Sequence, residues 1–351
     1  MTTATKSTVL EQRHQELGAK FTNFAGYKLP IWFSTMKDEH LAVRNAAGMF
    51  DISHMGMLKL SGEKAFDLLE KLSCNDANKC LDATIIYSMF LNESGMVLDD
   101  VMFGHLEQEF YLVVNGANFD KINAWVAKHN SDAVQVEHLN PSHTLIAVQG
   151  PKAAEAMNKA FNTAVAGLKA FGMGKFSVLG ETCVISRTGY TGEDGFECMI
   201  PHSIAEEFWK TLLQHNVAPC GLAARDTLRI EYGLPLYGQE LSESIHPFMT
   251  RYPWVVKFNH EFIGKKALEA AKDTSELKAV GLTLSEELIA RPNYDILEGG
   301  YVTSGTLSPI LNQSIALAFV KKELATVGTE VTVKIRRNNV KATVTKVPFI
   351  N

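Results

Sequence analysis

The stretch Ser-Arg-Thr-Gly-Tyr-Thr-Gly-Glu-Asp-Gly-Phe-Glu runs from Ser186 to Glu197, and its three glycines are spaced three residues apart. Glycine at this density indicates backbone conformations that other residues avoid, or a close approach of the backbone to another group. Apolar runs flank the stretch, Cys183 to Ile185 before it and Cys198 to Ile200 after it, so we predict a polar loop between two strands. The loop is either an acidic surface turn or a ligand-binding loop. Tyr190 and the flanking strands favour a ligand loop, because rigid strands hold loop residues in place.

The composition is that of an ordinary folded chain. Its 351 residues are enough for two or three domains. Hydrophobic residues make up 46% of the chain and charged residues 21%, which is typical of a globular protein. The net charge is −5 and no basic tract is present, so we expect no binding to nucleic acid.

Membrane and metal sites are not expected. Residues 1–20 are polar and of mixed charge, without the apolar core of a signal peptide, and no apolar run approaches the roughly 18 residues of a membrane span. The five cysteines are widely spaced, without a C-x-x-C motif, which argues against disulfides and zinc and for a reducing compartment. His40 and His54 lack partners at metal-ligand spacing. We therefore expect a cytoplasmic protein with no metal.

Two neighbouring aspartates interrupt an apolar strand. We predict strands over residues 85–91 and 96–103, joined by a turn at 92–95. Because side chains alternate across a strand, Asp99 and Asp100 face opposite sides, and one of them is directed into the packed side. A carboxylate there is costly unless it is paired. This residue is therefore either functional or a buried structural aspartate bonded to the backbone.

Two further features leave alternatives open. Met49 to Met57 alternates apolar and polar residues and predicts a strand, in which His54 is either a catalytic residue or a hydrogen-bonded structural one. Arg225 and Arg229 share one face of a predicted helix over 222–231. Both arginines are then free to serve an anion or a carboxylate, or the helix is solvated and salt-bridged.

The chain beyond residue 272 changes to short strands and turns. Predicted strands at 280–284, 305–308, 315–320, 331–335 and 340–347 indicate a small β-barrel or sandwich. Asn338-Asn339 is predicted to form the turn of the last hairpin.

Several stretches together resemble one family, the aminomethyltransferases that are the T-proteins of the glycine cleavage system. The stretches are Met49 to Met55, the turn with Asp99-Asp100, Arg187 to Glu197, Gly221 to Arg229, Leu234 to Gly238 and Gly300 to Pro309. They occur in the same order in the family, and the resemblance extends from about Phe21 to Phe349.

The resemblance implies an α+β fold of three domains in a cloverleaf arrangement, with a C-terminal β-barrel-like domain and a central folate channel. Residues 1–51 and 141–260 would form a discontinuous folate-binding domain, residues 52–140 an α+β domain that carries Asp99, and residues 261–351 the C-terminal domain.

The resemblance also implies the activity. Tetrahydrofolate would take the methylene of an aminomethyl group carried on the lipoyl arm of H-protein, a transient partner. The products would be 5,10-methylenetetrahydrofolate and ammonia.

The functional residues of the family can be placed on this sequence. Asp99 matches the active carboxylate, Glu197 the acid that hydrogen-bonds the pterin, and Arg225 a folate-pocket arginine. Further pocket positions match Met55, Tyr87, Val113, Asn115 and Tyr190, with Arg291 near the position of a residue at the channel mouth.

The sequence departs from the family pattern in one connector. Gln239 stands where His or Asn is common, and Glu231-Tyr232-Gly233 replaces Glu-Ala-Gly. His246 to Tyr252 replaces Thr-Pro-Leu-Glu-Ala-Gly-Leu. These changes leave the donor open. One alternative is a related folate-dependent demethylase that acts on a small methylated donor. Another is a non-catalytic folate-binding protein, although the Lys-Gly-Cys-Tyr motif of that group is absent.

Overall fold

The computed structural model of the chain describes residues 5–131, 134–272 and 274–350. Helices and sheets are mixed along the chain, so the predicted α+β class is confirmed. The chain divides into two units: unit 1 comprises residues 1–69, 77–87 and 101–225, and unit 2 comprises residues 70–76, 88–100 and 226–351. The predicted three-domain division follows other boundaries and stays a prediction.

The largest sheet of unit 1 holds the glycine-rich loop. Its strand order is β11-β12-β13-β10-β4-β14, with bounds Met173–Val178, Glu181–Ser186, Gly195–Pro201, His143–Gln149, Gly48–Asp51 and Ala218–Pro219. Strands β12 and β13 are antiparallel neighbours, with Ser186 opposite Glu197. The predicted loop between two strands is therefore confirmed.

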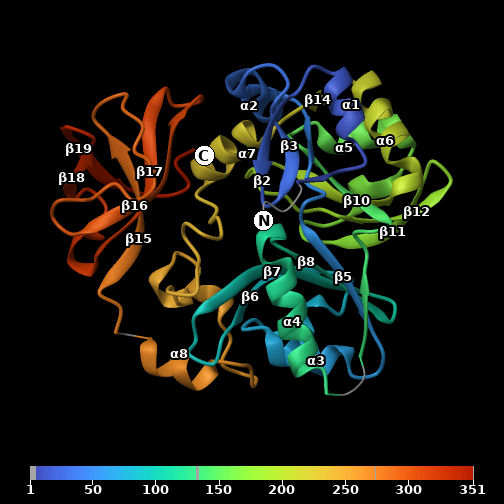
Figure 1. Ribbon diagram of the computed structural model, residues 1–351, viewed down its shortest axis with the longest axis horizontal. Helices are drawn as coiled ribbons and strands as arrows, with labels where there is room; N and C mark the ends of the chain where they lie inside the picture. Colours follow the sequence, from blue (N-terminus) through green and yellow to red (C-terminus); the bar gives the residue numbers. More distant parts are fainter. Residues whose placement is uncertain (1–4, 132–133, 273, 351) are drawn as a thin grey trace. The chain divides into compact units, whose positions relative to one another are not determined.

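Helices cover this sheet on one side. Figure 1 shows α1 (Glu11–Glu16), α5 (Ala153–Phe161) and α6 (His202–Gln214) beside it. Phe208 and Trp209 of α6 are fully buried with Phe196 of β13 in the same hydrophobic core. Burial of each such aromatic side chain contributes roughly 1.5–3 kcal/mol, so the sheet is a firm base for the loop that it carries.

A second sheet has the strand order β6-β7-β8-β5-β9. Its strands span Ile85–Leu91, Val97–Leu106, Glu109–Val114, Gly56–Ser61 and Gln135–His138, and the helices α3 (Ala65–Leu72) and α4 (Phe119–His129) lie between them in the sequence. Strand β6 passes from unit 1 into unit 2 after residue 87, and β7 passes from unit 2 back into unit 1 after residue 100.

The strand predicted from Met49 to Met57 is wrong. β4 ends at Asp51, β5 begins at Gly56, and the N–H of Met55 bonds the carbonyl of Ile52 in a turn between them. The Asp51 carboxylate accepts hydrogen bonds from the backbone N–H (3.0 Å) and the hydroxyl (2.6 Å) of Ser53. Such local bonds from side chain to backbone compete with strand pairing and explain the turn.

The remaining elements of unit 1 lead to its last helix. A small sheet has the order β1-β3-β2, with bounds Lys6–Ser7, Tyr27–Trp32 and Lys20–Phe24. Helix α2 (Met36–Asn45) follows, capped by the Thr35 side chain, which accepts the N–H of Asp38. Helix α7 (Leu222–Tyr232) begins in unit 1 and continues in unit 2.

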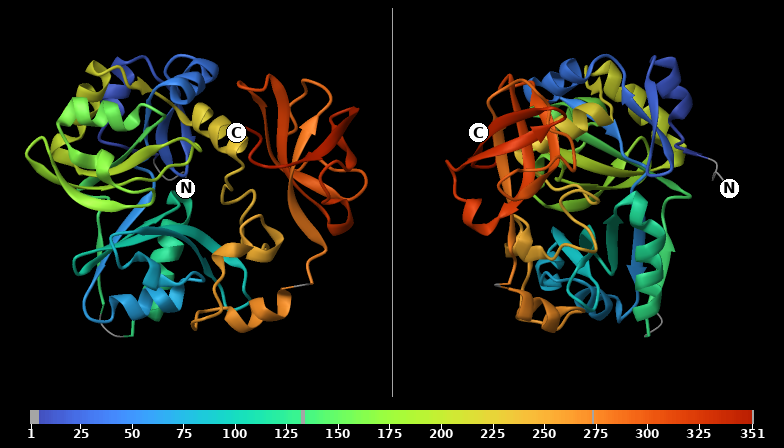
Figure 2. Two further views of the ribbon diagram at one scale, coloured as in Figure 1. Left: turned by 180° about the vertical axis from the view of Figure 1, so that it is seen from behind. Right: turned by 60° about the vertical axis from the view of Figure 1, so that its left-hand side comes forward.

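Unit 2 contains α8 (Lys265–Ala271) and a five-stranded sheet of order β16-β17-β15-β19-β18. The strands span Gly300–Ser308, Gln313–Lys321, Leu277–Leu284, Asn338–Thr345 and Glu330–Ile335, and they curve around a common interior (Figure 2). The interior is filled by aliphatic side chains such as Leu282, Val320 and Val333. This arrangement fits the predicted barrel-like domain.

The last hairpin turns two residues earlier than predicted. Asn338 pairs with Ile335, so Arg336 and Arg337 form the turn, and Arg336 has φ +56°. The prediction followed the Asn-Asn pair, whereas the alternation of buried valines on both strands sets the register.

Candidate functional site

The buried side chain of Gln149 holds the glycine-rich loop, residues 186–197, by hydrogen bonds. Its Nε2 donates to the carbonyl oxygen of Thr188 (3.0 Å), and its Oε1 accepts from the Thr191 hydroxyl (2.9 Å). A Cβ at Gly189 or Gly195 would overlap the Gln149 amide. Two of the three glycines are therefore explained by close approach to this side chain.

The charged residues of the loop are mostly used inside the protein. Arg187 forms a bidentate pair with Asp194, at 2.8 and 2.7 Å. Arg44 bonds the Glu193 carboxylate (2.9 Å) and the carbonyl of Thr191 (2.7 Å). These pairs hold the loop in shape. Tyr190, and Glu197 at the end of the loop, are its predicted ligand-binding residues.

Tyr190, Glu197 and Arg225 form one group in unit 1. The guanidinium carbon of Arg225 lies 4.7 Å from the centre of the Tyr190 ring, which is cation–π distance. Glu197 attracts the same guanidinium. Oε2 of Glu197 also accepts a hydrogen bond from Thr188 Oγ1 (2.7 Å). The group offers an aromatic face, a carboxylate and a cation.

Arg225 has unused hydrogen-bonding capacity. Burial lowers the pKa of its guanidinium from its ordinary value, while the Glu197 and Tyr190 side chains oppose that shift. Its Nη1 is buried and has no hydrogen-bond partner among the described residues. A buried donor without a partner costs about 1–3 kcal/mol, so a ligand acceptor beside it would be strongly favoured.

The predicted pocket residues Met55, Val113 and Asn115 lie along one pair of strands. Gly56 of β5 is opposite Val114 of β8, and Met57 is opposite Val113, so Met55 and Asn115 adjoin the same end of the pair. The carbonyl of Met55 accepts a hydrogen bond from Nδ2 of Asn140 (2.8 Å), which fixes this end. Tyr87 is partly buried on β6.

The side chain of His54 is buried within electrostatic range of Arg225, and only 5% of the residue's surface is exposed. Burial, helped by the positive charge of Arg225, lowers the pKa of its imidazole to about 4, while Asp51 opposes the shift. The ring is therefore neutral at pH 7 and cannot donate a proton as an imidazolium. Its Nδ1 has no hydrogen-bond partner within the described ranges.

Asp99 and Asp100 belong to unit 2 and face opposite sides of β7. Asp99 is fully buried, as are Val101 and Phe103 at the same strand parity, whereas Asp100 is partly exposed. The predicted alternation is confirmed, with Asp99 on the packed side. Asp100 lies within electrostatic reach of Tyr252.

Of the two alternatives for α7, the salt-bridged one holds for Arg229. Its side chain is buried and donates to Asp226 (2.9 Å), to Glu240 (3.0 Å) and to Ser304 (2.7 Å). Asp226 is three residues earlier on the helix and therefore reaches it. Arg291, in unit 2, is exposed.

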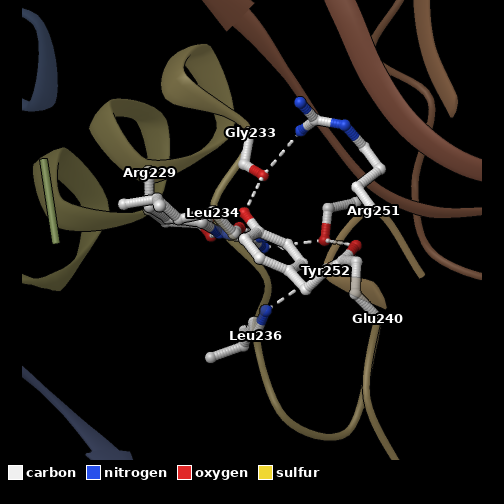
Figure 3. A network of polar contacts seen from close by, with 9 residues as sticks. Arg229, Gly233, Leu234, Leu236, Glu240, Arg251 and Tyr252 are labelled. Carbon is white, nitrogen blue, oxygen red and sulfur yellow. Dashed lines mark hydrogen bonds and ion pairs between the residues drawn. The ribbon is translucent and has the colours of Figure 1, made fainter. Parts of the chain in front are cut away.

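The segment that departs from the family pattern is bonded within unit 2. Figure 3 shows the Tyr252 hydroxyl and Arg251 both directed at the carbonyl oxygen of Gly233, at 2.8 and 3.0 Å. Arg251 also donates to the carbonyl of Val347 (2.8 Å). Burial raises the pKa of the Tyr252 phenol to about 12, so the hydroxyl remains a donor. The segment thus caps the end of α7.

The described residues contain neither a cluster of metal ligands nor a helix that could span a membrane. In residues 5–131, 134–272 and 274–350, no group of three or more His, Cys, Asp or Glu side chains could hold a metal ion. No helix formed by those residues has the length and apolar character needed to cross a membrane.

Comparisons with known proteins agree over nearly the whole chain. The GCVT N-terminal domain model matches residues 10–260, and the glycine cleavage T-protein C-terminal barrel domain model matches residues 278–351. An aminomethyltransferase of Staphylococcus epidermidis is 40% identical over 357 residues, covering 99% of this chain and 98% of the relative. An aminomethyltransferase of Flavobacterium psychrophilum is 38% identical, covering 98% and 99%.

A solved structure is also similar over nearly the whole chain. The crystal structure of glycine cleavage system aminomethyltransferase T from Bartonella henselae has a TM-score of 0.93 and 32% identity, covering 99% of this chain and 98% of that one. The chain belongs to the glycine cleavage T-protein family. The resemblance noted in the sequence and the α+β fold with a C-terminal barrel domain are both confirmed.

Proposed function

We propose that the chain is the aminomethyltransferase of a glycine cleavage system and that tetrahydrofolate is its acceptor substrate. The observation that carries the proposal is the group of Tyr190, Glu197 and Arg225, in a chain that is similar to aminomethyltransferases over 99% of its length. The group supplies an aromatic face, a carboxylate and a cation with a donor to spare.

The reaction is a redox-neutral exchange. The donor carbon loses its bonds to the lipoyl sulfur and to the amino nitrogen and gains bonds to N5 and N10 of the folate. The two protons released from N5 and N10 go to the thiolate and to the amine. The products are the dihydrolipoyl arm, ammonia and 5,10-methylenetetrahydrofolate.

Glu197 is proposed to bind the pterin. The pterin ring carries several N–H donors, and an ionised carboxylate accepts up to about four hydrogen bonds. One oxygen of Glu197 already accepts from Thr188, which fixes its rotamer. The preorganised carboxylate then pairs with the ring at a small entropy cost.

Arg225 and Tyr190 are proposed to complete the folate site. Arg225 would donate a charge-assisted hydrogen bond to an acceptor atom of the folate, because its Nη1 lacks a partner among the described residues. Met55, Tyr87, Val113 and Asn115 are proposed to line the pocket, and Arg291 to lie at its mouth.

Asp99 is proposed to act on the transferred carbon. A fixed carboxylate in a packed wall orients the folate nitrogens and stabilises the positive charge that develops when ammonia leaves. Its complete burial suits such a role, since charge stabilisation is strongest away from water.

Lipoylated H-protein is the proposed donor, bound transiently. The alternative of a small methylated donor came from the unusual segment His246 to Tyr252. Arg251 and Tyr252 of that segment bond backbone carbonyls of unit 2, so its sequence has a structural explanation.

The experiment is a turnover assay for 5,10-methylenetetrahydrofolate with purified protein and tetrahydrofolate. Aminomethylated H-protein is supplied, omitted, or replaced by methylated amines and sulfonium compounds. We expect product and ammonia in equal amounts with H-protein only. Product from a small methylated donor without H-protein would establish the demethylase instead.

A further inference from the structure

Glu39 is a buried carboxylate that holds backbone from two distant parts of unit 1. It lies on α2 with 2% of its surface exposed. Its Oε1 accepts the N–H groups of Phe33 (2.6 Å) and Ser34 (2.9 Å), just after β3. Its Oε2 accepts the N–H of Gly221 (2.8 Å), just before α7. Three hydrogen bonds offset the cost of burying the charge.

The residue held by Glu39 starts the helix that carries Arg225. Gly221 accepts the backbone N–H of Arg225 (3.2 Å) in the first turn of α7. A Cβ at Gly221 would overlap the backbone of Ile31, so the helix start lies directly against the end of β3. A carboxylate is also favourable beside the positive end of a helix.

We infer that Glu39 is a positioning residue for the folate site. By holding Gly221 against β3, it sets the rotation and height of the first turn of α7. The guanidinium of Arg225 is thereby placed over Tyr190 and near Glu197. Cation–π attraction needs the charge within about 6 Å of the ring centre, and here the distance is 4.7 Å. The inference rests on the proposed function, in which this group binds tetrahydrofolate.

The first test is Glu39→Gln. Glutamine keeps the shape of the side chain but replaces one acceptor oxygen by an NH2 group. That group would face either the N–H of Gly221 or those of Phe33 and Ser34, donor against donor. We expect the dissociation constant of tetrahydrofolate, measured by isothermal titration, to rise about tenfold or more. The KM for tetrahydrofolate should rise with it, while kcat at saturation changes less.

A double-mutant cycle separates positioning from general damage to the fold. If Glu39 acts through Arg225, Glu39→Gln should change the dissociation constant by no more than about twofold in an Arg225→Ala background. The loss of thermal stability caused by Glu39→Gln should be the same in both backgrounds. An equal fold-change in both backgrounds, or unchanged affinity in Glu39→Gln alone, would overturn the inference.

Glu240→Gln is the matched control. Glu240 is also buried and also accepts three hydrogen bonds, from Leu236 (3.0 Å), Arg229 (3.0 Å) and Ser304 (2.7 Å). We expect the affinity of the Glu240→Gln variant for tetrahydrofolate to stay within about twofold of wild type. If Glu240→Gln lost as much affinity for tetrahydrofolate as Glu39→Gln, weakening any buried carboxylate with three hydrogen bonds would have this effect. That result would overturn the inference. Wild-type protein that binds no tetrahydrofolate would instead refute the proposed function.

Discussion

Thr188 donates a hydrogen bond of 2.7 Å from its hydroxyl to Oε2 of Glu197. The same hydroxyl is 2.8 Å from that of Ser186, and the carbonyl of Thr188 is bonded by Gln149. The carboxylate proposed to bind the pterin is therefore oriented by a chain of contacts that ends in the buried sheet.

We predict that Thr188→Val weakens tetrahydrofolate binding by about 1 kcal/mol, roughly fivefold, because the Glu197 carboxylate loses the hydroxyl hydrogen bond that sets its rotamer. Thr188→Ser keeps the hydroxyl and should bind nearly as wild type does. The measurement is isothermal titration of both variants. Equal affinities for the Val and Ser variants would show that the hydroxyl is not used.

Asp99→Asn should lower the single-turnover rate by roughly two to four orders of magnitude, the range for one positioned acid–base group. Asp100→Asn, on the opposite side of β7, should stay within about tenfold of wild type. Melting temperatures check that both variants are folded. If Asp100→Asn shows the large loss and Asp99→Asn does not, the wrong aspartate has been assigned to the chemistry.

Gln149→Ala should destabilise unit 1 by about 2–3 kcal/mol, since it removes three hydrogen bonds and leaves the Thr191 hydroxyl without its acceptor. Gln12→Ala, an exposed glutamine whose amide bonds Glu16, should cost less than about 0.5 kcal/mol. Urea unfolding of the two variants gives both values. Losses of similar size would mean that Gln149 is not the anchor of the loop.

Acid should destabilise the protein through His54. Burial and Arg225 lower the pKa of its imidazole from 6.5 to about 4, so between these values the unfolded chain binds the extra proton. Stability from the neutral ring is complete above pH 6.5 and is lost as the pH falls towards 4, by roughly 3 kcal/mol in total.

The measurement is urea unfolding at several pH values between 7 and 4, with His54→Asn as the comparison. That variant should lose this part of the pH dependence. The carboxyl of Asp51 does not contribute to the pH dependence in this range. Burial raises its pKa, but hydrogen bonds from His14, Ser53 and Thr8 outweigh burial and hold the pKa below its ordinary value of 3.8. Its contribution is therefore lost only at lower pH. An identical slope in wild type and His54→Asn would contradict the assignment.

Structural features that depend on residues close together in the sequence could be predicted from it. The alternation of β7 predicted that one of the two aspartates faces the packed side, and the apolar runs around the glycines placed the loop between β12 and β13. Asp226 and Arg229 are three residues apart on one helix, which is the spacing of an ion pair, and the structure has that pair.

Contacts between distant parts of the sequence could not be predicted in this way. Glu39 is separated by 182 positions from Gly221, and Gln149 by 42 from Thr191. A buried Glu or Gln in a single sequence looks like any other polar residue of a helix or strand. The turn at 52–55 was not predicted, because an alternating pattern does not reveal that the Asp51 carboxylate bonds the backbone N–H of Ser53.

The binding of tetrahydrofolate at Glu197 is tested most directly by isothermal titration of wild type and Glu197→Ala, with Glu193→Gln as a control from the same loop that bonds Arg44. We predict that Glu197→Ala weakens binding by about 2–3 kcal/mol, roughly 30- to 150-fold, while Glu193→Gln stays close to wild type. Unchanged affinity in Glu197→Ala would contradict the assignment of this group as the folate site.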